Sequence, residues 1–403
     1  MEKQRIVITG VGVVAPNGIG KEQFWTNCAA GVSGIKPITL FDVSKYRCRW
    51  AGEISNFRPE QYLGPKGLRN LDRTTLLALV AAKLAIEDAK LEISDETRND
   101  IGVVLGSTMG SVHSISEFDK EGLREGPRYV NPAHFPNTVI NSPASQVAIR
   151  FGLKGLNTTI STGFTASLDA IGYAMDMLRL GRVKTLLVGG VEELCIQTFL
   201  GFYKLGLLAT SSNGTPAPLA PFGSEARGTL LGEGAAFFSV ELFEDAERRG
   251  VHPLAELVGY GTHFNPEAMY RYDREGVGAS RAIQAALDDA GITPSEVPLV
   301  NTCANGIPGW DNGERKVLSQ VFSMTAGDAT VRSTKSLIGE TFSADGVLRL
   351  AATLGELAEE VGVVIEGSGP MGLSSAIVVN AGVSHEAVTV AKRVTRHATN
   401  RQS

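Results

Sequence analysis

Two hydrophobic periodicities alternate along this chain, and residues 157–191 show both most clearly. Short β-branched residues predict a buried strand over Asn157–Ser161. Gly163 permits a sharp turn, and a helix is expected from about Thr165 to Leu180. One stripe of that helix is apolar: Leu168, Ile171, Met175 and Leu178. The nearly continuous apolar run Lys184–Val191 predicts a strand that is covered on both faces.

The rest of the chain repeats this alternation of short strands and helices. In the first half we expect strands at Arg5–Thr9 and Ile101–Gly106, and helices at Lys21–Ala30 and Arg69–Lys90. In the second half we expect strands at Ala255–Gly261, Leu299–Thr302, Thr330–Ser333 and Ser375–Asn380, with a helix through Gly278–Ala290. Strands that alternate with helices indicate stacked α/β layers and mixed sheets.

A glycine pattern near the N-terminus raises the question of a dinucleotide site. Gly10, Gly12 and Ala15 match G-x-G-x-x-A after the first strand. Pro16 stands where the fingerprint needs a continuing helix, and no acidic residue marks the end of a following strand. We therefore favour a turn that leads into the helix at Lys21–Ala30.

Composition argues against nucleic-acid-binding, disulfide-rich, secreted and membrane-spanning classes of protein. The chain has 403 residues, is 43% hydrophobic and 20% charged, and carries a net charge of −5, which gives no general argument for nucleic-acid binding. Its four cysteines are widely spaced, so neither a metal site nor a disulfide framework is expected, and reduced thiols favour the cytoplasm. We expect no secretory signal and no membrane span, because no apolar run reaches about 18–20 residues.

The turn at residues 161–165 has the architecture of a nucleophile site without a nucleophile. Phe164 stands at its apex, on the first turn of the predicted helix. Backbone N–H groups and the helix dipole would lower the pKa of a cysteine at this position. Phenylalanine has no lone pair with which to attack a substrate.

The segment STGFTASLDAIGYA resembles the active-site segment of β-ketoacyl synthases, which place the catalytic cysteine where Phe164 stands. The resemblance extends from about Arg5 to Val379. A further motif, Pro221-Phe222 with Arg227, Gly228 and Gly232–Ala235, also follows the family, and we expect its Glu233 to be structural. The resemblance implies an α/β thiolase fold with two βαβ-rich halves in five αβαβα layers. We place these halves at 1–250 and 251–385, followed by a basic flexible tail at 386–403.

The two other catalytic positions of the family are also altered. In NTCANGIPGWDNGE the register places Cys303 at the first catalytic histidine, and in KSLIGETFSADG it places Glu340 at the second. None of the six histidines falls at either position. The gating turn of the family aligns with Gly369–Gly372, where Pro370 replaces the gating phenylalanine. The catalytic cysteine and both catalytic histidines are thus replaced, while the motifs around them are retained. This combination indicates a natural subunit that no longer catalyses the reaction.

The resemblance implies a non-catalytic chain-length factor (ketosynthase-β) of a bacterial type II polyketide synthase. Such a subunit would form a heterodimer with a catalytic ketosynthase and shape its acyl tunnel during malonyl-carrier condensation. Many aromatic-polyketide factors have glutamine at the Phe164 position, so the departure leaves aromatic and aryl-polyene products both open. Two alternatives remain: an enzyme rewired around Cys303 and Glu340, and a homodimer that binds an acyl group or a carrier protein.

Partner and tunnel residues follow from the same resemblance. Lys66, Arg69 and Arg73 could contact an acidic acyl carrier protein, although a solvated helix start also explains these charges. Tunnel walls are expected at Val112, Ile115, Phe135 and Phe164, where core packing is the alternative. We expect no cofactor or metal of this chain's own, since the carrier protein brings the phosphopantetheine, and no nucleic-acid or membrane partner.

Overall fold

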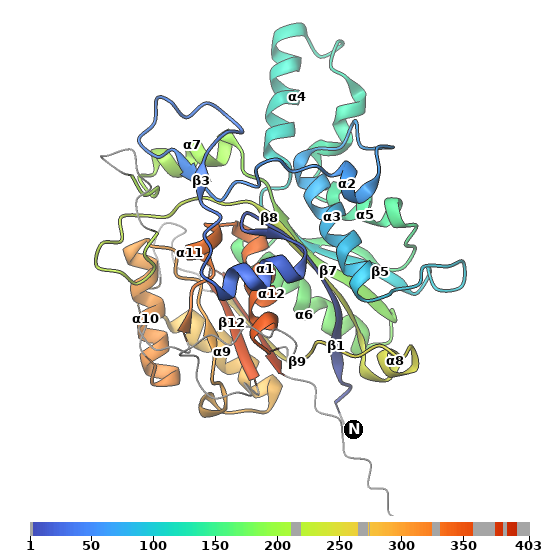
Figure 1. Ribbon diagram of the computed structural model, residues 1–403, viewed down its shortest axis with the longest axis vertical. Helices are drawn as coiled ribbons and strands as arrows, with labels where there is room; N and C mark the ends of the chain where they lie inside the picture. The colour runs from blue at the N-terminus through green and yellow to red at the C-terminus, as the bar shows by residue number, and fades with distance from the viewer. Residues whose placement is uncertain are drawn as a thin grey trace, which may run out of the picture.

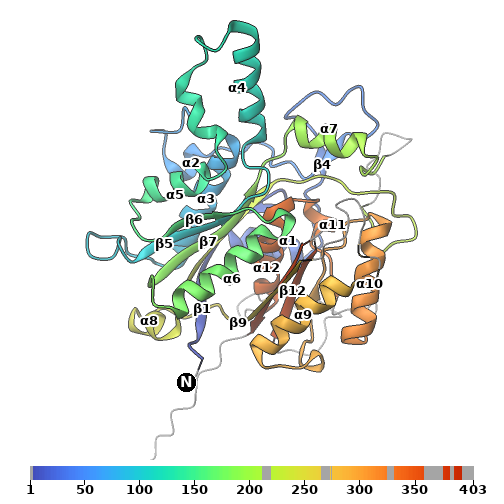
Figure 2. The ribbon, with the colours of Figure 1, turned by 180° about the vertical axis from the view of Figure 1, so that it is seen from behind.

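One large mixed sheet runs through both halves of the chain (Figures 1 and 2). The computed structural model describes residues 3–210, 219–264, 273, 275–324, 331–357, 375–381 and 385–392. The strand order is β11-β10-β12-β13-β9-β1-β8-β7-β5-β6. The first half supplies β1 (Ile6–Ala15), β5 (Ile101–Gly106), β6 (Asn157–Ile160), β7 (Thr185–Glu192) and β8 (Gly234–Leu242). The second half supplies β9 (Ala255–Phe264), β10 (Val300–Asn301), β11 (Val331–Arg332), β12 (Ser375–Ala381) and β13 (His385–Lys392).

Helices form three layers around the two halves of this sheet. Helices α3 (Arg73–Asp88) and α5 (Ser142–Phe151) cover the outer face of the first half, and α9 (Val277–Ala290) and α10 (Pro308–Phe322) cover that of the second. Helices α6 (Ala166–Arg179) and α12 (Asp345–Leu357) lie between the two halves of the sheet. Their apolar residues pack against strands from both halves and form one hydrophobic core with them. The five αβαβα layers expected from the resemblance are therefore present.

Shorter elements connect these layers. They are α1 (Lys21–Ala29), α2 (Glu60–Leu63), α7 (Ile196–Lys204), α8 (Phe243–Arg248) and α11 (Lys335–Ile338), the 3₁₀ turns η2 (Gly163–Thr165), η3 (Pro294–Glu296) and η4 (Phe342–Ala344), and the short strands β2 (Gly18–Ile19), β3 (Lys36–Pro37) and β4 (Trp50–Ala51). Within the ranges that the structure describes, no helix is long and apolar enough to cross a membrane.

The stretch around Phe164 forms the predicted elements, but its first strand is not buried as expected. Within β6, Asn157 is exposed and Thr158–Ile160 are partly exposed, because β6 is the edge strand of the sheet. Strand β6, turn η2, helix α6 and strand β7 follow one another, and the predicted helical stripe of α6 is buried. Every residue of β7 is buried, as expected for a strand covered on both faces. Gly163 has a φ of 81°, a conformation that favours glycine and that the sharp turn requires.

The N-terminal glycines are used for packing, and the first strand is longer than predicted, so that the turn before α1 comes at Pro16 and Asn17. Strand β1 continues through Gly10 and Gly12 to Ala15, so the strand–turn–helix of a dinucleotide site is not formed. A Cβ at Gly10 would lie 2.5 Å from the backbone nitrogen of Ala89, and one at Gly12 would overlap the carbonyl oxygen of Ala81. These glycines therefore let the backbone of α3 approach the strand closely.

Two further boundaries differ from the sequence prediction. Helix α3 begins at Arg73 instead of Arg69, because the Asp72 side chain accepts a hydrogen bond from the Thr75 N–H and caps the helix. The proposed flexible tail is wrong for its first part, since 386–392 belong to β13 between β12 and β9. Residues 387–391 are buried in this paired strand, while 393–403 lie outside the described residues.

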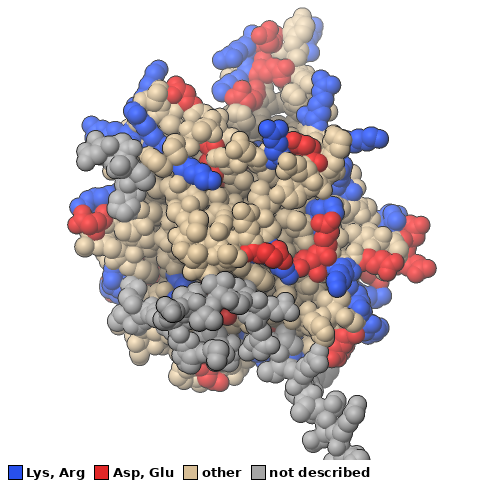
Figure 3. Space-filling view, in the orientation of Figure 1, with Lys and Arg blue, Asp and Glu red and all other residues tan. Residues whose placement is uncertain are grey.

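Helix α4 (Val112–Glu125) and turn η1 (Pro132–Thr138) form an arm that projects from the layered body (Figures 1 and 2). Within the arm Phe118 contacts Phe135, with ring centroids 6.0 Å apart. No residue of α4 is buried. Its surface carries charges of both signs, visible at the top of Figure 3.

Arg73 and Glu233 join α3 to the start of β8. Two guanidinium nitrogens of Arg73 donate to the carboxylate of Glu233, at 2.6 and 2.5 Å. The same carboxylate accepts from the backbone N–H groups of Ile54 and Leu194 and is fully buried. Glu233 is thus structural, and it connects three segments of the first half.

The substitution Arg73→Met is expected to destabilise the protein by about 3 kcal/mol, because it leaves the Glu233 carboxylate buried without its cation. The free energy of unfolding from denaturant titration measures the loss. Arg69→Met is the matched control: Arg69 is exposed, and the expected change stays within about 0.5 kcal/mol. Equal effects of the two substitutions would contradict the buried-pair interpretation.

Candidate functional site

Phe164 fills the turn with an aromatic ring. Its centroid lies 5.3 Å from that of Phe342 in η4 and 5.8 Å from that of Trp310 in α10. Phe202 of α7 also contacts Phe342, with ring centroids 5.3 Å apart. These rings come from four separate elements. The turn therefore presents an apolar aromatic cluster where the family places a nucleophile.

Cys303 follows β10 and is buried. Its backbone N–H donates to Glu314 Oε1 at 2.8 Å, and its thiol donates to Glu314 Oε2 at 3.4 Å. Burial, with the nearby Glu314 carboxyl, raises the pKa of the Cys303 thiol well above its ordinary value. Burial likewise raises the pKa of Glu314 to about 7. Since the thiolate is the reactive form, this cysteine is poorly suited to be a nucleophile.

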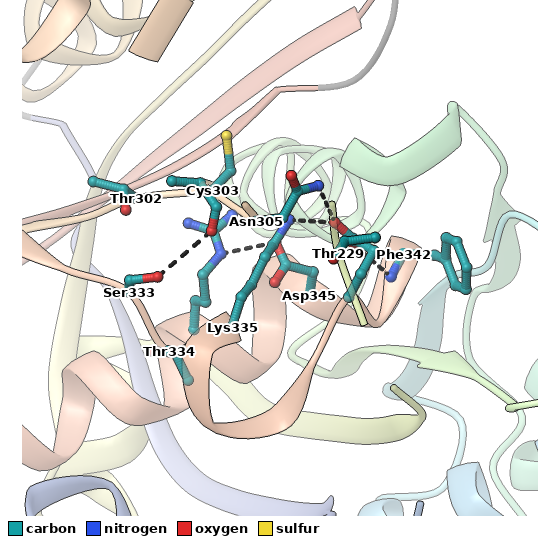
Figure 4. Close-up of polar contacts among 12 residues, drawn as sticks. Thr229, Thr302, Cys303, Asn305, Ser333, Thr334, Lys335, Phe342 and Asp345 are labelled. Atoms are coloured by element: carbon teal, nitrogen blue, oxygen red, sulfur yellow. Dashed lines mark hydrogen bonds and ion pairs between the residues drawn. The ribbon is translucent and has the colours of Figure 1, made fainter. Parts of the chain in front are cut away.

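Glu340 is buried and accepts hydrogen bonds from three residues that are labelled in Figure 4, Lys335, Asn305 and Phe342. Its Oε2 accepts from Lys335 Nζ at 2.8 Å and from Asn305 Nδ2 at 3.0 Å. Its Oε1 accepts from the backbone N–H of Phe342 at 2.9 Å. A histidine at this position could donate a ring N–H to a developing oxyanion. A carboxylate has no such donor, and this one already accepts three hydrogen bonds.

The ion pair of Glu340 extends into a buried network of charges. Lys335 Nζ also lies 3.3 Å from Asp345 Oδ2, which accepts from Arg349 Nε at 2.8 Å. Arg349 Nη1 donates to the carbonyl oxygen of Asn301 at 2.7 Å. Burial alone would lower the pKa of Lys335, but the attraction of Asp345 and Glu340 outweighs it and raises this pKa. Two cations, Lys335 and Arg349, thus pair with two carboxylates, Glu340 and Asp345, so that the charges within the network balance.

The fold brings the three altered catalytic positions together. Phe164 touches Phe342, the Phe342 N–H donates to Glu340, and Glu340 accepts from Asn305, two residues after Cys303. Sequence reasoning had found these three positions from motif register. It missed the contributions of Asn305, Lys335, Asp345 and Arg349, since no sequence signal shows that such polar residues are buried and paired.

The proposed tunnel residues do not form one group in the described chain. Val112 and Ile115 are partly exposed on α4, and Phe135 is 57% exposed beside Phe118 in the arm. Phe164 belongs to the aromatic cluster in the body. Their role in a tunnel stays a prediction. The gate residues Gly369 and Pro370 lie outside the described residues.

The proposed carrier surface needs one correction. Lys66 and Arg69 are exposed, and their contact with a carrier protein stays a prediction. Arg73 points inward to Glu233, so its charge is neutralised within the fold. Over the described ranges, no group of three or more His, Cys, Asp or Glu residues is placed to hold a metal ion. The expectation that the chain has no cofactor of its own also stays a prediction.

Comparisons with known proteins agree with this architecture. A solved structure described as the ishigamide ketosynthase/chain length factor matches with a TM-score of 0.86 and 26% identity, over 98% of this chain and all of that one. A structure described as a type II polyketide acyl-carrier protein in complex with its ketosynthase matches equally well, with the same TM-score, identity and coverage.

Sequence relatives point to the same family. A 3-oxoacyl-[acyl-carrier-protein] synthase 2 of Staphylococcus aureus is 34% identical over 345 residues, which cover 86% of this chain and 83% of the relative. The corresponding protein of Coxiella burnetii is 34% identical over 349 residues, covering 86% and 84%. The family models for the N-terminal and C-terminal domains of β-ketoacyl synthases match residues 3–246 and 254–364. The chain therefore belongs to the β-ketoacyl synthase family.

Proposed function

We propose that this chain is the non-catalytic, chain-length-factor subunit of a ketosynthase heterodimer in type II polyketide biosynthesis. The observation that carries the proposal is the state of the three catalytic positions. Phe164 has no nucleophilic atom, Cys303 is a buried thiol, and Glu340 is committed to Lys335 and Asn305. Covalent acyl transfer needs an activated nucleophile, and enolate stabilisation needs free donors.

The exposed surface near the arm supports the role of a partner. Leu123 of α4, Phe135 of η1 and Tyr129 between these two elements are 87%, 57% and 76% exposed, and large exposed apolar side chains on a projecting arm are available to a protein partner. Strand β6 stands at the end of the sheet order, where an unpaired edge can pair with another chain. A catalytic ketosynthase that covers this surface would place its acyl tunnel beside the arm.

The same site argues against the rewired-enzyme alternative. A Cys303–Glu340 catalytic pair would require a thiolate and a base that is free to accept its proton. Glu314, not Glu340, accepts from the Cys303 thiol, and Glu340 is already bound by a cation. A homodimer that binds an acyl group or a carrier protein is distinguished from our proposal by the assembly it forms.

The direct test is co-expression with an intact Cys-His-His ketosynthase encoded beside this chain, followed by size exclusion and a malonyl-carrier condensation assay. We expect a 1:1 complex that condenses and that becomes inactive when the partner's cysteine is replaced. Each chain purified alone is the control. A stable homodimer or monomer of this chain that does not bind the co-expressed ketosynthase would contradict the proposal.

Restoring the cysteine by Phe164→Cys is expected to give no turnover, because the two histidine positions still hold Cys303 and Glu340. The condensation assay is run on the complex whose partner has lost its own catalytic cysteine, so that any product must come from this chain. Phe164→Ala is the matched control for loss of the ring. Turnover by Phe164→Cys alone would show that our assignment of the two histidine positions is wrong.

Cys303 is expected to resist a thiol-specific alkylating reagent at neutral pH in the native protein and to react after denaturation. With its pKa well above 9, less than about 1% of the thiol is ionised at pH 7. Peptide mapping by mass spectrometry measures the modification at each cysteine before and after unfolding. Rapid native labelling of Cys303, accompanied by loss of condensation, would favour the rewired enzyme.

A further inference from the structure

The donors around Glu340 form a complete binding site for a carboxylate. A lysine ammonium, a side-chain amide and a backbone N–H converge on its two oxygens at 2.8 to 3.0 Å. They come from α11, from the segment after β10 and from η4 (Figure 4). The Lys335 and Glu340 side chains are 2% and 0% exposed. Charge-assisted hydrogen bonds in such a dry site favour a small anion.

Each donor is held by contacts that do not involve Glu340. The Asn305 backbone N–H donates to Asp311, and its side-chain oxygen accepts from the Ile307 N–H, at 3.0 and 3.1 Å. Lys335 is also paired with Asp345. The ring of Phe342 contacts the rings of Phe164 and Phe202. The site is therefore preorganised, and shortening residue 340 leaves its donors in place.

We infer that this pocket is a carboxylate-binding site that the chain occupies with its own Glu340 side chain. Glu340 acts there as an internal ligand, and it excludes external carboxylates, including an acid group on an acyl chain. The inference concerns a pocket inside this chain. It is tested by stability and does not depend on pairing with a ketosynthase, so its failure would leave the proposed function untouched.

The variant Glu340→Ala tests the inference by chemical rescue. The substitution removes Cγ and the carboxylate, which together have the size of acetate. Without a ligand, Lys335 and Asn305 lose their acceptor, and the thermal unfolding midpoint is expected to fall. Sodium acetate is expected to raise the midpoint of the variant by a few degrees in a saturable manner. Sodium chloride at the same ionic strength serves as the salt control.

Three matched proteins separate site binding from a general salt effect. The wild-type chain, whose site is filled, is expected to respond equally to acetate and chloride. Glu340→Gln fills the space without the charge and leaves no room for acetate, so no specific rescue is expected. The double variant Lys335→Met, Glu340→Ala lacks the cation and is expected to lose most of the acetate effect.

The outcome that overturns the inference is an equal response of Glu340→Ala to acetate and to chloride. If this variant does not fold without a ligand, refolding from denaturant in acetate or chloride replaces the melting experiment. Acetate-dependent recovery of folded Glu340→Ala would support the site. Equal failure in both salts, under conditions where the wild-type chain refolds, would overturn it.

Discussion

The close approach of the two central helices is the constraint on which the site depends. Helices α6 and α12 are the shared middle layer, and the turns η2 and η4 that precede them meet at their N-terminal ends. A Cβ at Gly346 of α12 would lie 2.6 Å from Leu168 Cγ of α6, and one at Gly190 of the neighbouring strand β7 would lie 2.6 Å from Ser167 Cβ of α6. A larger residue at either position would force the facing side chains of α6 to shift. The contact brings Phe164 and Phe342, from sequence positions far apart, into one aromatic cluster.

Burial between these layers also decides what polar residues can do there. A charge in this environment is costly unless it is paired and hydrogen-bonded. Glu340 is tolerated because Lys335 and Asn305 donate hydrogen bonds to it. Lys335 also pairs with Asp345, and Asp345 in turn pairs with Arg349. The same burial keeps the thiol of Cys303 protonated. One environment thus explains both a stable ion network and an unreactive cysteine.

The scaffold of a β-ketoacyl synthase and the chemistry of its site are separable in this chain. The five layers, the turn at Gly163 and the structural carboxylate of Glu233 remain. The positions that would react hold a ring, a buried thiol and a paired carboxylate. Such a chain can keep the surfaces through which the fold associates while it leaves condensation to another subunit, which is the basis of the proposed function.

The sequence by itself determined the elements and the three altered positions, because hydrophobic period and motif register are local properties. Thus α6 buries its predicted apolar stripe, β7 is buried on both faces as its apolar run predicts, and Phe164, Cys303 and Glu340 stand where the motifs place them. Only the tertiary structure decided that β1 continues through Gly10, that Arg73 turns inward to Glu233, and that β13 replaces part of a tail. It alone showed that Lys335 and Glu340 are a buried pair. Burial and pairing depend on residues that are distant in sequence, and local patterns carry no record of which side chains will meet.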